Sequence, residues 1–195
     1  MPGIDVSKVL VGAPDQKVTG AILDAPLGTK LPKTAAEKPD AAFTSSGYVS
    51  EDGLKLTTDR STNDVKEWGG AVVRKLLESF DCTIGWSECQ MSYESLCHAF
   101  GSSNVKRTAA TQQNGEQIIV SINSSLPPAR SWTFNMKDGL ARIRIVVPNG
   151  QVTNVDEIAF VSSDSVKLPI TLTTYPDEDG NNIYIMTDDG IIGRA

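Results

Sequence analysis

The chain has 195 residues, of which 39% are hydrophobic and 22% charged, a composition typical of a soluble folded domain. No run approaches the roughly 18 apolar residues of a membrane span, and the first residues lack the charged and apolar regions of a signal peptide. The formal net charge of −6 argues against tight binding of nucleic acid. We therefore expect a single domain over residues 1–195 that folds in a cytoplasm and has no membrane segment.

The cysteines and the single histidine give no sign of a metal site. Cys82, Cys89 and Cys97 are odd in number and form no C-x-x-C pair, so we interpret them as reduced, small apolar side chains. His98 is the only histidine, and a zinc site would need further histidine or paired cysteine ligands. We therefore predict no bound metal and no cofactor.

The first part of the chain predicts one short strand between two irregular segments. Residues 1–16 form an N-terminal arm without clear periodicity, and residues 17–23 (KVTGAIL) suit a strand. Residues 24–43 contain three prolines, which interrupt regular structure. A loop of about twenty residues is uncommon in a compact domain unless it is functional. We interpret this segment as an extended contact loop that becomes ordered on assembly.

A polar stretch follows the next strand and contains an isolated tryptophan. An E-D-G turn at residues 51–53 precedes a strand over residues 54–61, in which apolar and polar positions alternate. Residues 59–70 (DRSTNDVKEWGG) are too polar for a core, yet Trp68 is a costly side chain to leave in a solvent loop. We predict a loop over residues 59–70 that docks on another surface through Trp68.

The region after the glycine pair predicts a long strand and then the one clear helix. Residues 71–80 suit a helix or a strand, and the strand that follows favours the second interpretation. Residues 78–89 alternate strictly between apolar and polar side chains, which predicts a strand with one buried face. Residues 92–101 predict a helix with Ser92 as its N-cap and Gly101 as its stop. His98 lies near its C-terminus, where a cation is mildly favoured.

The second half of the chain predicts many short strands separated by turns. Turn signals stand at S-S-L-P-P-A-R, K-D-G, P-N-G and D-E-D-G-N-N. This pattern predicts a mainly β fold, a β-sandwich or barrel of two packed antiparallel sheets flanked by one α-helix. The expected strands are residues 116–123, 131–136, 140–147, 157–163, 166–175 and 181–187.

Motifs that carry catalytic chemistry are absent from the sequence. There is no second histidine for a triad, no nucleophile elbow and no glycine-rich phosphate loop. Asp177, Asp179 and Gly180 have the spacing of a calcium loop, but Tyr175 and Met186 occupy two positions that need oxygen ligands. We interpret that stretch as a hairpin turn. We predict that the protein is not an enzyme and has no catalytic, cofactor-binding or metal-binding residues.

Several motifs, in order, resemble one protein family. They are a D-A-P-L-G-T-x-L-P stretch (24–32), a G-Y-x-S-E-D-G turn (47–53), a D-R-S-T-x-D-x-K-x-W-G-G loop (59–70), the long strand, and a Y-E-S-L-x-x-x-F-G helix (93–101). Together they resemble the major tail tube protein of long, non-contractile-tailed bacteriophages. Beyond residue 110 the resemblance depends on the strand pattern alone.

The resemblance implies a structural virion protein. Its subunits would form hexameric rings, in which inner sheets join into one barrel, and the rings would stack into the tube through which the genome is ejected. Implied partners are the tape measure protein, the tail terminator and the tail tip, and double-stranded DNA would pass without specific binding. The expected location is the virion tail, after assembly in the host cytoplasm. Residues 188–195 would be a C-terminal arm, and we expect no C-terminal immunoglobulin-like domain.

The resemblance also implies residue roles. An acidic lumen would repel phosphates, so polar residues of the best strands are candidates for its wall. The expected lumen-facing residues are Thr57, Asp59, Asp81 and Thr83. The expected inter-subunit contacts are Asp59, Arg60, Asp64, Lys66, Trp68, Gly69 and Gly70.

Two other functions remain open at this point. One is another hexameric ring or tube protein, such as a tail terminator or a secretion-system tube. The other is a monomeric carbohydrate-binding or adhesive β-sandwich. That function would need aromatic side chains clustered on one face, whereas Trp68, Trp86 and Trp132 are scattered and aromatic residues make up only 6% of the chain.

Overall fold

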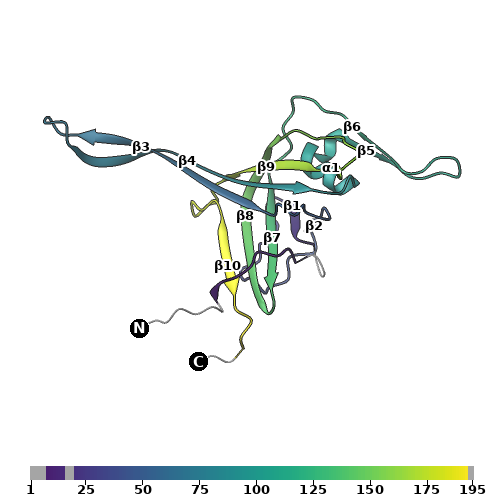
Figure 1. The fold of residues 1–195 in the computed structure, drawn as a ribbon, viewed down its shortest axis with the longest axis horizontal. Helices are drawn as coiled ribbons and strands as arrows, with labels where there is room; N and C mark the ends of the chain where they lie inside the picture. Colours follow the sequence, from purple (N-terminus) through teal and green to yellow (C-terminus); the bar gives the residue numbers. More distant parts are fainter. Residues whose placement is uncertain (1–7, 16–19, 193–195) are drawn as a thin grey trace.

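The computed structural model describes residues 8–15 and 20–192, and in them the mainly β fold is confirmed (Figure 1). Within these residues one α-helix, α1 (Tyr93–Phe100), accompanies ten strands. The strands are β1 (Ile22–Pro26), β2 (Thr44–Ser45), β3 (Lys55–Lys66), β4 (Val72–Glu88), β5 (Val105–Thr108), β6 (Gln117–Val120), β7 (Arg130–Asp138), β8 (Ala141–Val155), β9 (Leu168–Tyr175) and β10 (Tyr184–Asp188).

Eight strands form one antiparallel sheet in the order β2-β1-β7-β8-β9-β4-β3, with β10 beside β8, and β5 and β6 form a second sheet. Strand β8 is the centre of the fold. Strand β7 pairs with one edge of β8, while β10 and β9 pair with consecutive stretches of its other edge. Strand β8 thus connects the side of the sheet that contains β1 and β7 with the side that contains β9 and β4.

The large sheet folds over on itself to enclose the core. Three strand spacings separate β7 from β4 in the sheet order, which would place them ~14 Å apart in a flat sheet. Yet the ring centroids of Trp86 on β4 and Trp132 on β7 lie 5.5 Å apart. Phe134 packs edge-on against Trp86 at 5.4 Å. The two halves therefore pack face to face as the two layers of a sandwich.

Strand β8 is where the structure differs most from the sequence prediction. The P-N-G turn expected after residue 147 lies inside the strand, and residues 157–163 form no strand. Pro148 has no N–H to donate, and it lies opposite the register shift between Arg130 and Trp132, where the ladder is already interrupted. The side chains of Ser131 and Trp132 donate to the carbonyls of Pro148 and Gly150, which stabilises the bulge.

Several other boundaries differ from expectation. Strand β1 continues to Pro26, into the predicted loop 24–43, and part of the predicted strand 17–23 lies outside the described residues. Strand β5 was not predicted. The ambiguous residues 71–80 belong to β4, which confirms the strand interpretation. The D-E-D-G-N-N turn between β9 and β10 is also confirmed: the Asp177 carboxylate accepts hydrogen bonds from the backbone N–H groups of residues 179 and 181.

The helix is confirmed almost residue for residue. Ser92 caps it by accepting from the N–H of Ser95 at 3.1 Å, and Gly101 ends it with a positive φ of 82°. Ala99 packs into the sandwich core, while Leu96 packs against Leu168 and Val105. The helix therefore closes one end of the sandwich and anchors the small β5–β6 sheet.

Residues 27–43 form a strap that packs on their own chain. Arg144 on β8 is only 7% exposed, and its Nη1 donates to the carbonyls of Thr34, at 3.0 Å, and Glu37. Its Nε donates to Asn135 at 2.7 Å. The last residue of the strap, Phe43, is buried against Leu23 and Ala25 of β1. The expected contact arm is therefore already held against the domain in the single chain.

We expect Arg144→Met to release this strap. The substitution leaves the Thr34 and Glu37 carbonyls without their donor, at a cost of about 2–3 kcal/mol. Trypsin should then cut after Lys30 and Lys33 faster than in the wild type, measured by mass spectrometry of the fragments. Arg142→Met, a half-buried position on the same strand, is the matched control. Equal cleavage rates in the two variants would contradict the role of Arg144.

Candidate functional site

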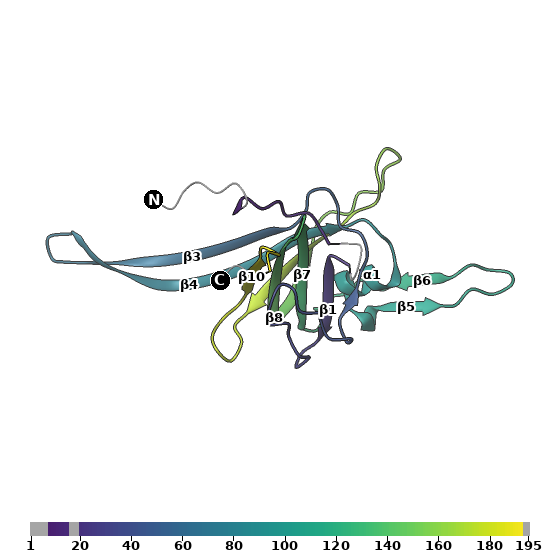
Figure 2. The same cartoon turned by 90° about the horizontal axis from the view of Figure 1, so that it is seen from below.

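The most conspicuous feature of the molecule is the long hairpin of β3 and β4, which leaves the body at one end, while the β5–β6 hairpin leaves at the other (Figures 1 and 2). Strand β4 pairs with β9 only from Thr83 to Glu88. From Val72 to Cys82 it pairs with β3 alone. This two-stranded part extends ~30 Å at the usual rise per residue. Both of its outer edges carry unpaired backbone groups.

The predicted loop 59–70 is mostly strand. Strand β3 continues to Lys66, and only the residues from Glu67 to Gly70 form the turn. The Glu67 N–H donates to the Ala71 carbonyl, and the Gly70 N–H donates to the Glu67 carbonyl, both at 2.9 Å. Gly70 has a φ of 89°, which only glycine adopts without strain. The sequence prediction failed because polar residues suit a strand that is solvated on both faces.

Apolar side chains are exposed along this hairpin. Trp68 at the tip is 106% exposed, so it makes no core contact. A two-stranded ribbon is marginally stable alone, and exposed apolar strands with open edges promote association. Contact with another chain would remove these apolar side chains and open strand edges from water. The other apolar residues on the hairpin, each at least 37% exposed, are Leu56, Val65, Val72, Val73, Leu76 and Leu77.

The four candidate lumen residues share one face of the hairpin. Thr57 lies directly opposite Thr83, and Asp59 lies directly opposite Asp81. Residues that are opposite in an antiparallel pair point to the same side. This side faces away from the core, because Cys82 and Ile84, which alternate with Asp81 and Thr83 along β4, are buried. Two like charges in register destabilise a hairpin. The alignment of Asp59 with Asp81 therefore does not stabilise the hairpin.

The predicted contact residues all lie on the part of the hairpin where β3 and β4 pair only with each other. Arg60 stacks over the ring of Phe80, 4.5 Å from its centroid, and Asp64 forms an ion pair with Lys75 at 2.7 Å. Lys66, Trp68, Gly69 and Gly70 are at or beside the tip. The structure thus brings the seven residues together on one projecting element.

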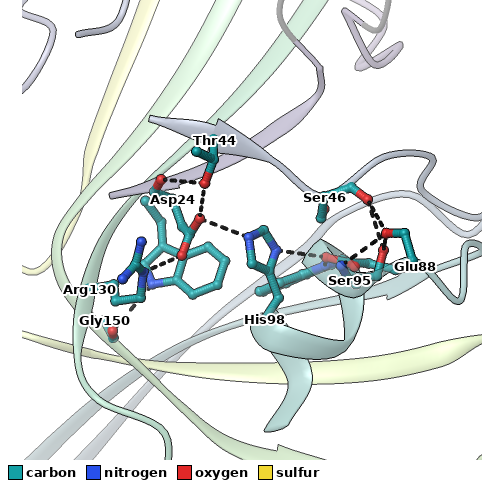
Figure 3. A network of polar contacts seen from close by, with 11 residues as sticks. Asp24, Thr44, Ser46, Glu88, Ser95, His98, Arg130 and Gly150 are labelled. Atoms are coloured by element: carbon teal, nitrogen blue, oxygen red, sulfur yellow. Dashed lines mark hydrogen bonds and ion pairs between the residues drawn. The ribbon is translucent and has the colours of Figure 1, made fainter. Parts of the chain in front are cut away.

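A second polar cluster lies inside the body, and it was not predicted. Figure 3 shows His98 of α1 between Asp24 of β1 and Glu88 of β4. The His98 Nε2 is 2.8 Å from Asp24 Oδ1, and Nδ1 is 3.1 Å from Glu88 Oε1. Arg130 of β7 forms an ion pair with the other Asp24 oxygen, and Trp86 Nε1 donates to Glu88 at 3.2 Å. We call Asp24, Glu88, His98 and Arg130 the buried quartet; the first three are buried, and the Arg130 side chain is 31% exposed.

The buried quartet balances two acids with two bases. Burial alone would lower the pKa of His98, but hydrogen bonds and charge from Asp24 and Glu88 outweigh it and raise the pKa to about 9. Burial alone would raise the pKa of Asp24, but His98 and Arg130 outweigh it and hold that pKa below its usual value. The quartet is therefore a charged crosslink between α1 and three strands.

One signal in the sequence could have indicated this cluster. Glu88 continues the alternation of Phe80, Cys82, Ile84 and Trp86, so it belongs to the buried face of β4. A buried carboxylate needs a partner, and a chain with one histidine offers an obvious one. Asp24 gave no such signal, because the sequence placed it in a loop.

The structure adds two findings on other sites. Among residues 8–15 and 20–192, no group of three or more acidic, cysteine or histidine side chains is arranged to hold a metal ion. In the same residues, no helix has the length and apolar character to cross a membrane.

The described residues thus combine a β-sandwich with a projecting hairpin whose apolar side chains are exposed. The chain belongs to the phage tail tube protein family, whose pattern it matches over residues 3–192. It is thus a structural component of a phage tail. No curated protein matches it by sequence.

Two solved structures are similar to this chain. The cap that terminates the tube of the anti-feeding prophage is 12% identical, with a TM-score of 0.47, and the match covers 95% of this chain and 96% of that one. A chain of the sheath–tube complex of an extracellular contractile injection system, PVC, in its extended state is 10% identical, with a TM-score of 0.42, and the match covers 95% and 100%.

Proposed function

We propose that this chain is the major subunit of the tail tube, and that it forms hexameric rings that stack into the conduit for genome ejection. The observation that carries the proposal is the β3–β4 hairpin, which exposes apolar side chains and two open strand edges. Neighbouring subunits would cover both. Closing a sheet into a ring removes edges that would otherwise aggregate, and membership of the tail tube family supports this assembly.

The face that carries Thr57, Asp59, Asp81 and Thr83 is proposed to line the lumen. These side chains are short hydroxyls and carboxylates, and the carboxylates repel DNA phosphates. A lysine-rich wall would instead bind the phosphates strongly and retard the DNA. Double-stranded DNA then passes without specific binding. The aligned pair of Asp59 and Asp81, unfavourable for the hairpin itself, is explained by this role.

The remaining roles concern assembly. Arg60, Asp64, Lys66 and the Trp68-Gly69-Gly70 tip are proposed to contact adjacent subunits. Asp59, which lies opposite Asp81, is proposed to line the lumen and not to form such a contact. The tape measure protein, tail terminator and tail tip are the proposed partners, and assembly takes place in the host cytoplasm.

Negative-stain microscopy of the concentrated, purified protein tests the proposal. Six-fold rings or hollow tubes are expected. Persistent monomers, also in the presence of tail-tip components, would contradict it and favour an adhesive β-sandwich. Isolated rings that never stack would favour a tail terminator.

The lumen assignment predicts a kinetic effect. In virions that carry Asp59→Lys with Asp81→Lys, tubes should assemble, because the two side chains point away from the core. Genome ejection should be severalfold slower, most of all at low salt, because the new lysines bind phosphates. Fluorescent-dye detection of released DNA measures the rate.

The matched control for that experiment is Asp156→Lys with Glu157→Lys, an equal charge change at exposed positions after β8. Equal ejection rates in the two sets of virions would contradict lumen exposure of Asp59 and Asp81.

A further inference from the structure

The exposed Trp68 requires a receptor surface if the hairpin contacts a neighbour. A tryptophan buries ~150–250 Å² when it is covered, so it dominates the interface it enters. Lys66 precedes the turn and Arg74 lies opposite Val65 on β4, and neither forms an ion pair within the described residues. Glu67 directly precedes Trp68. The tip is therefore an aromatic knob with two bases and one acid near it.

A cavity of about 550 Å³ opens at the base of the same hairpin. Its walls come from the N-terminal segment, the turn before β3 and the strands β1 and β7. The volume lies within the ~300–1,000 Å³ of cavities that enclose small aromatic ligands. The apolar lining includes Pro14, Ile22, Val49, Leu54, Phe134 and Met136.

The rim of this cavity carries one acidic side chain, Glu51. A carboxylate at the opening of an apolar cavity suits an aromatic knob with Lys66 and Arg74 near it.

We propose that Trp68 of one subunit inserts into this cavity of the next subunit. The inference rests on the proposed function and names the surface that receives the hairpin. A subunit cannot fill its own cavity, because the twelve residues of β3 separate base from tip by ~40 Å. The contact joins unlike surfaces, so it repeats head to tail and builds an extended assembly.

Crosslinking in assembled tubes tests the contact while leaving Trp68 intact. Glu67→Cys places a thiol beside Trp68, and Glu51→Cys places one on the rim. Cys82 is buried, and burial raises the pKa of the Cys89 and Cys97 thiols, so the introduced thiols react first. Tubes of the double variant are treated with a short bismaleimide and separated under denaturing conditions.

The expected product is a ladder that extends beyond the dimer, about tenfold or more above that of Glu67→Cys with Glu157→Cys, because bound neighbours hold the two thiols at high effective concentration. Dimers alone would indicate a symmetric contact and overturn the proposal. Tubes without crosslinking above the control would also overturn it, while the proposed function stands. Wild-type protein that forms no tubes would contradict both.

Discussion

Trp68→Ala is expected to abolish tube assembly while leaving the subunit folded. The side chain is 106% exposed, so its loss removes no intramolecular packing, and surface substitutions of this kind change stability by only about 0.5 kcal/mol. Loss of an aromatic hot spot costs about 2 kcal/mol or more per contact, roughly a thirtyfold change in each association constant. Because a tube repeats the contact in every subunit, we expect no tubes by negative stain and an unchanged melting temperature.

Trp86→Ala is the contrasting variant. Trp86 is 4% exposed and packs on Trp132 and Phe134, so its loss should cost about 3–5 kcal/mol of subunit stability. Trp68→Phe should restore part of the assembly, since it keeps an aromatic ring. Normal tubes from Trp68→Ala would show that the tip is not an anchor, and a large fall in its melting temperature would show that the side chain packs within the subunit.

The sequence predicts the strands of this hairpin near the body and a docking role for its tip, but it does not reveal that β3 continues as a strand to Lys66. The strict alternation from Phe80 to Trp86 predicts one buried and one wet face, and both are present. Beyond the body, apolar and polar side chains no longer alternate, because no face of the hairpin packs on the core there. The sequence around Asp64 and Lys66 therefore predicts a loop. The structure shows instead a two-stranded ribbon whose apolar side chains are exposed in the single chain.

Long-range pairing limits the other predictions. Pro148 signals a turn locally, but its place opposite a bulge in β7 allows the strand to continue. Residues 27–43 read as a free loop, because nothing local indicates that Arg144, more than 100 residues away, holds their carbonyls. His98 likewise appears as a helix-end residue until Asp24 and Glu88 are brought to it by the folded sheet.

His98→Leu is expected to destabilise the subunit strongly and to remove part of its pH dependence. The variant leaves Asp24 and Glu88 buried with less positive charge, and breaking a buried pair typically costs about 3–5 kcal/mol. In the wild type, the pKa of His98 rises from 6.5 to about 9 on folding, a shift worth about 3 kcal/mol. Because the folded pKa is the higher one, this stabilisation is complete below pH 6.5 and is lost as the pH rises through about 9.

Asp24 contributes with the opposite sign. Its pKa is lowered on folding from 3.8, so its stabilisation is present above that value and is lost as the pH falls below it. Urea unfolding across pH 3 to 10 measures both effects. The difference in unfolding free energy between wild type and His98→Leu should be largest near pH 5–6 and shrink by about 3 kcal/mol towards pH 10.

The difference between the two proteins is the informative quantity, because lysines and tyrosines that titrate at alkaline pH are common to both and cancel. His98→Gln keeps hydrogen-bonding capacity without the charge, so it should recover part of the stability at every pH but none of the alkaline decline. Profiles for wild type and His98→Leu that stay parallel between pH 6.5 and 10 would show that the buried histidine is neutral over that range. In that case Arg130 alone would compensate the two carboxylates, and the quartet would be a hydrogen-bonded cluster rather than a charged crosslink.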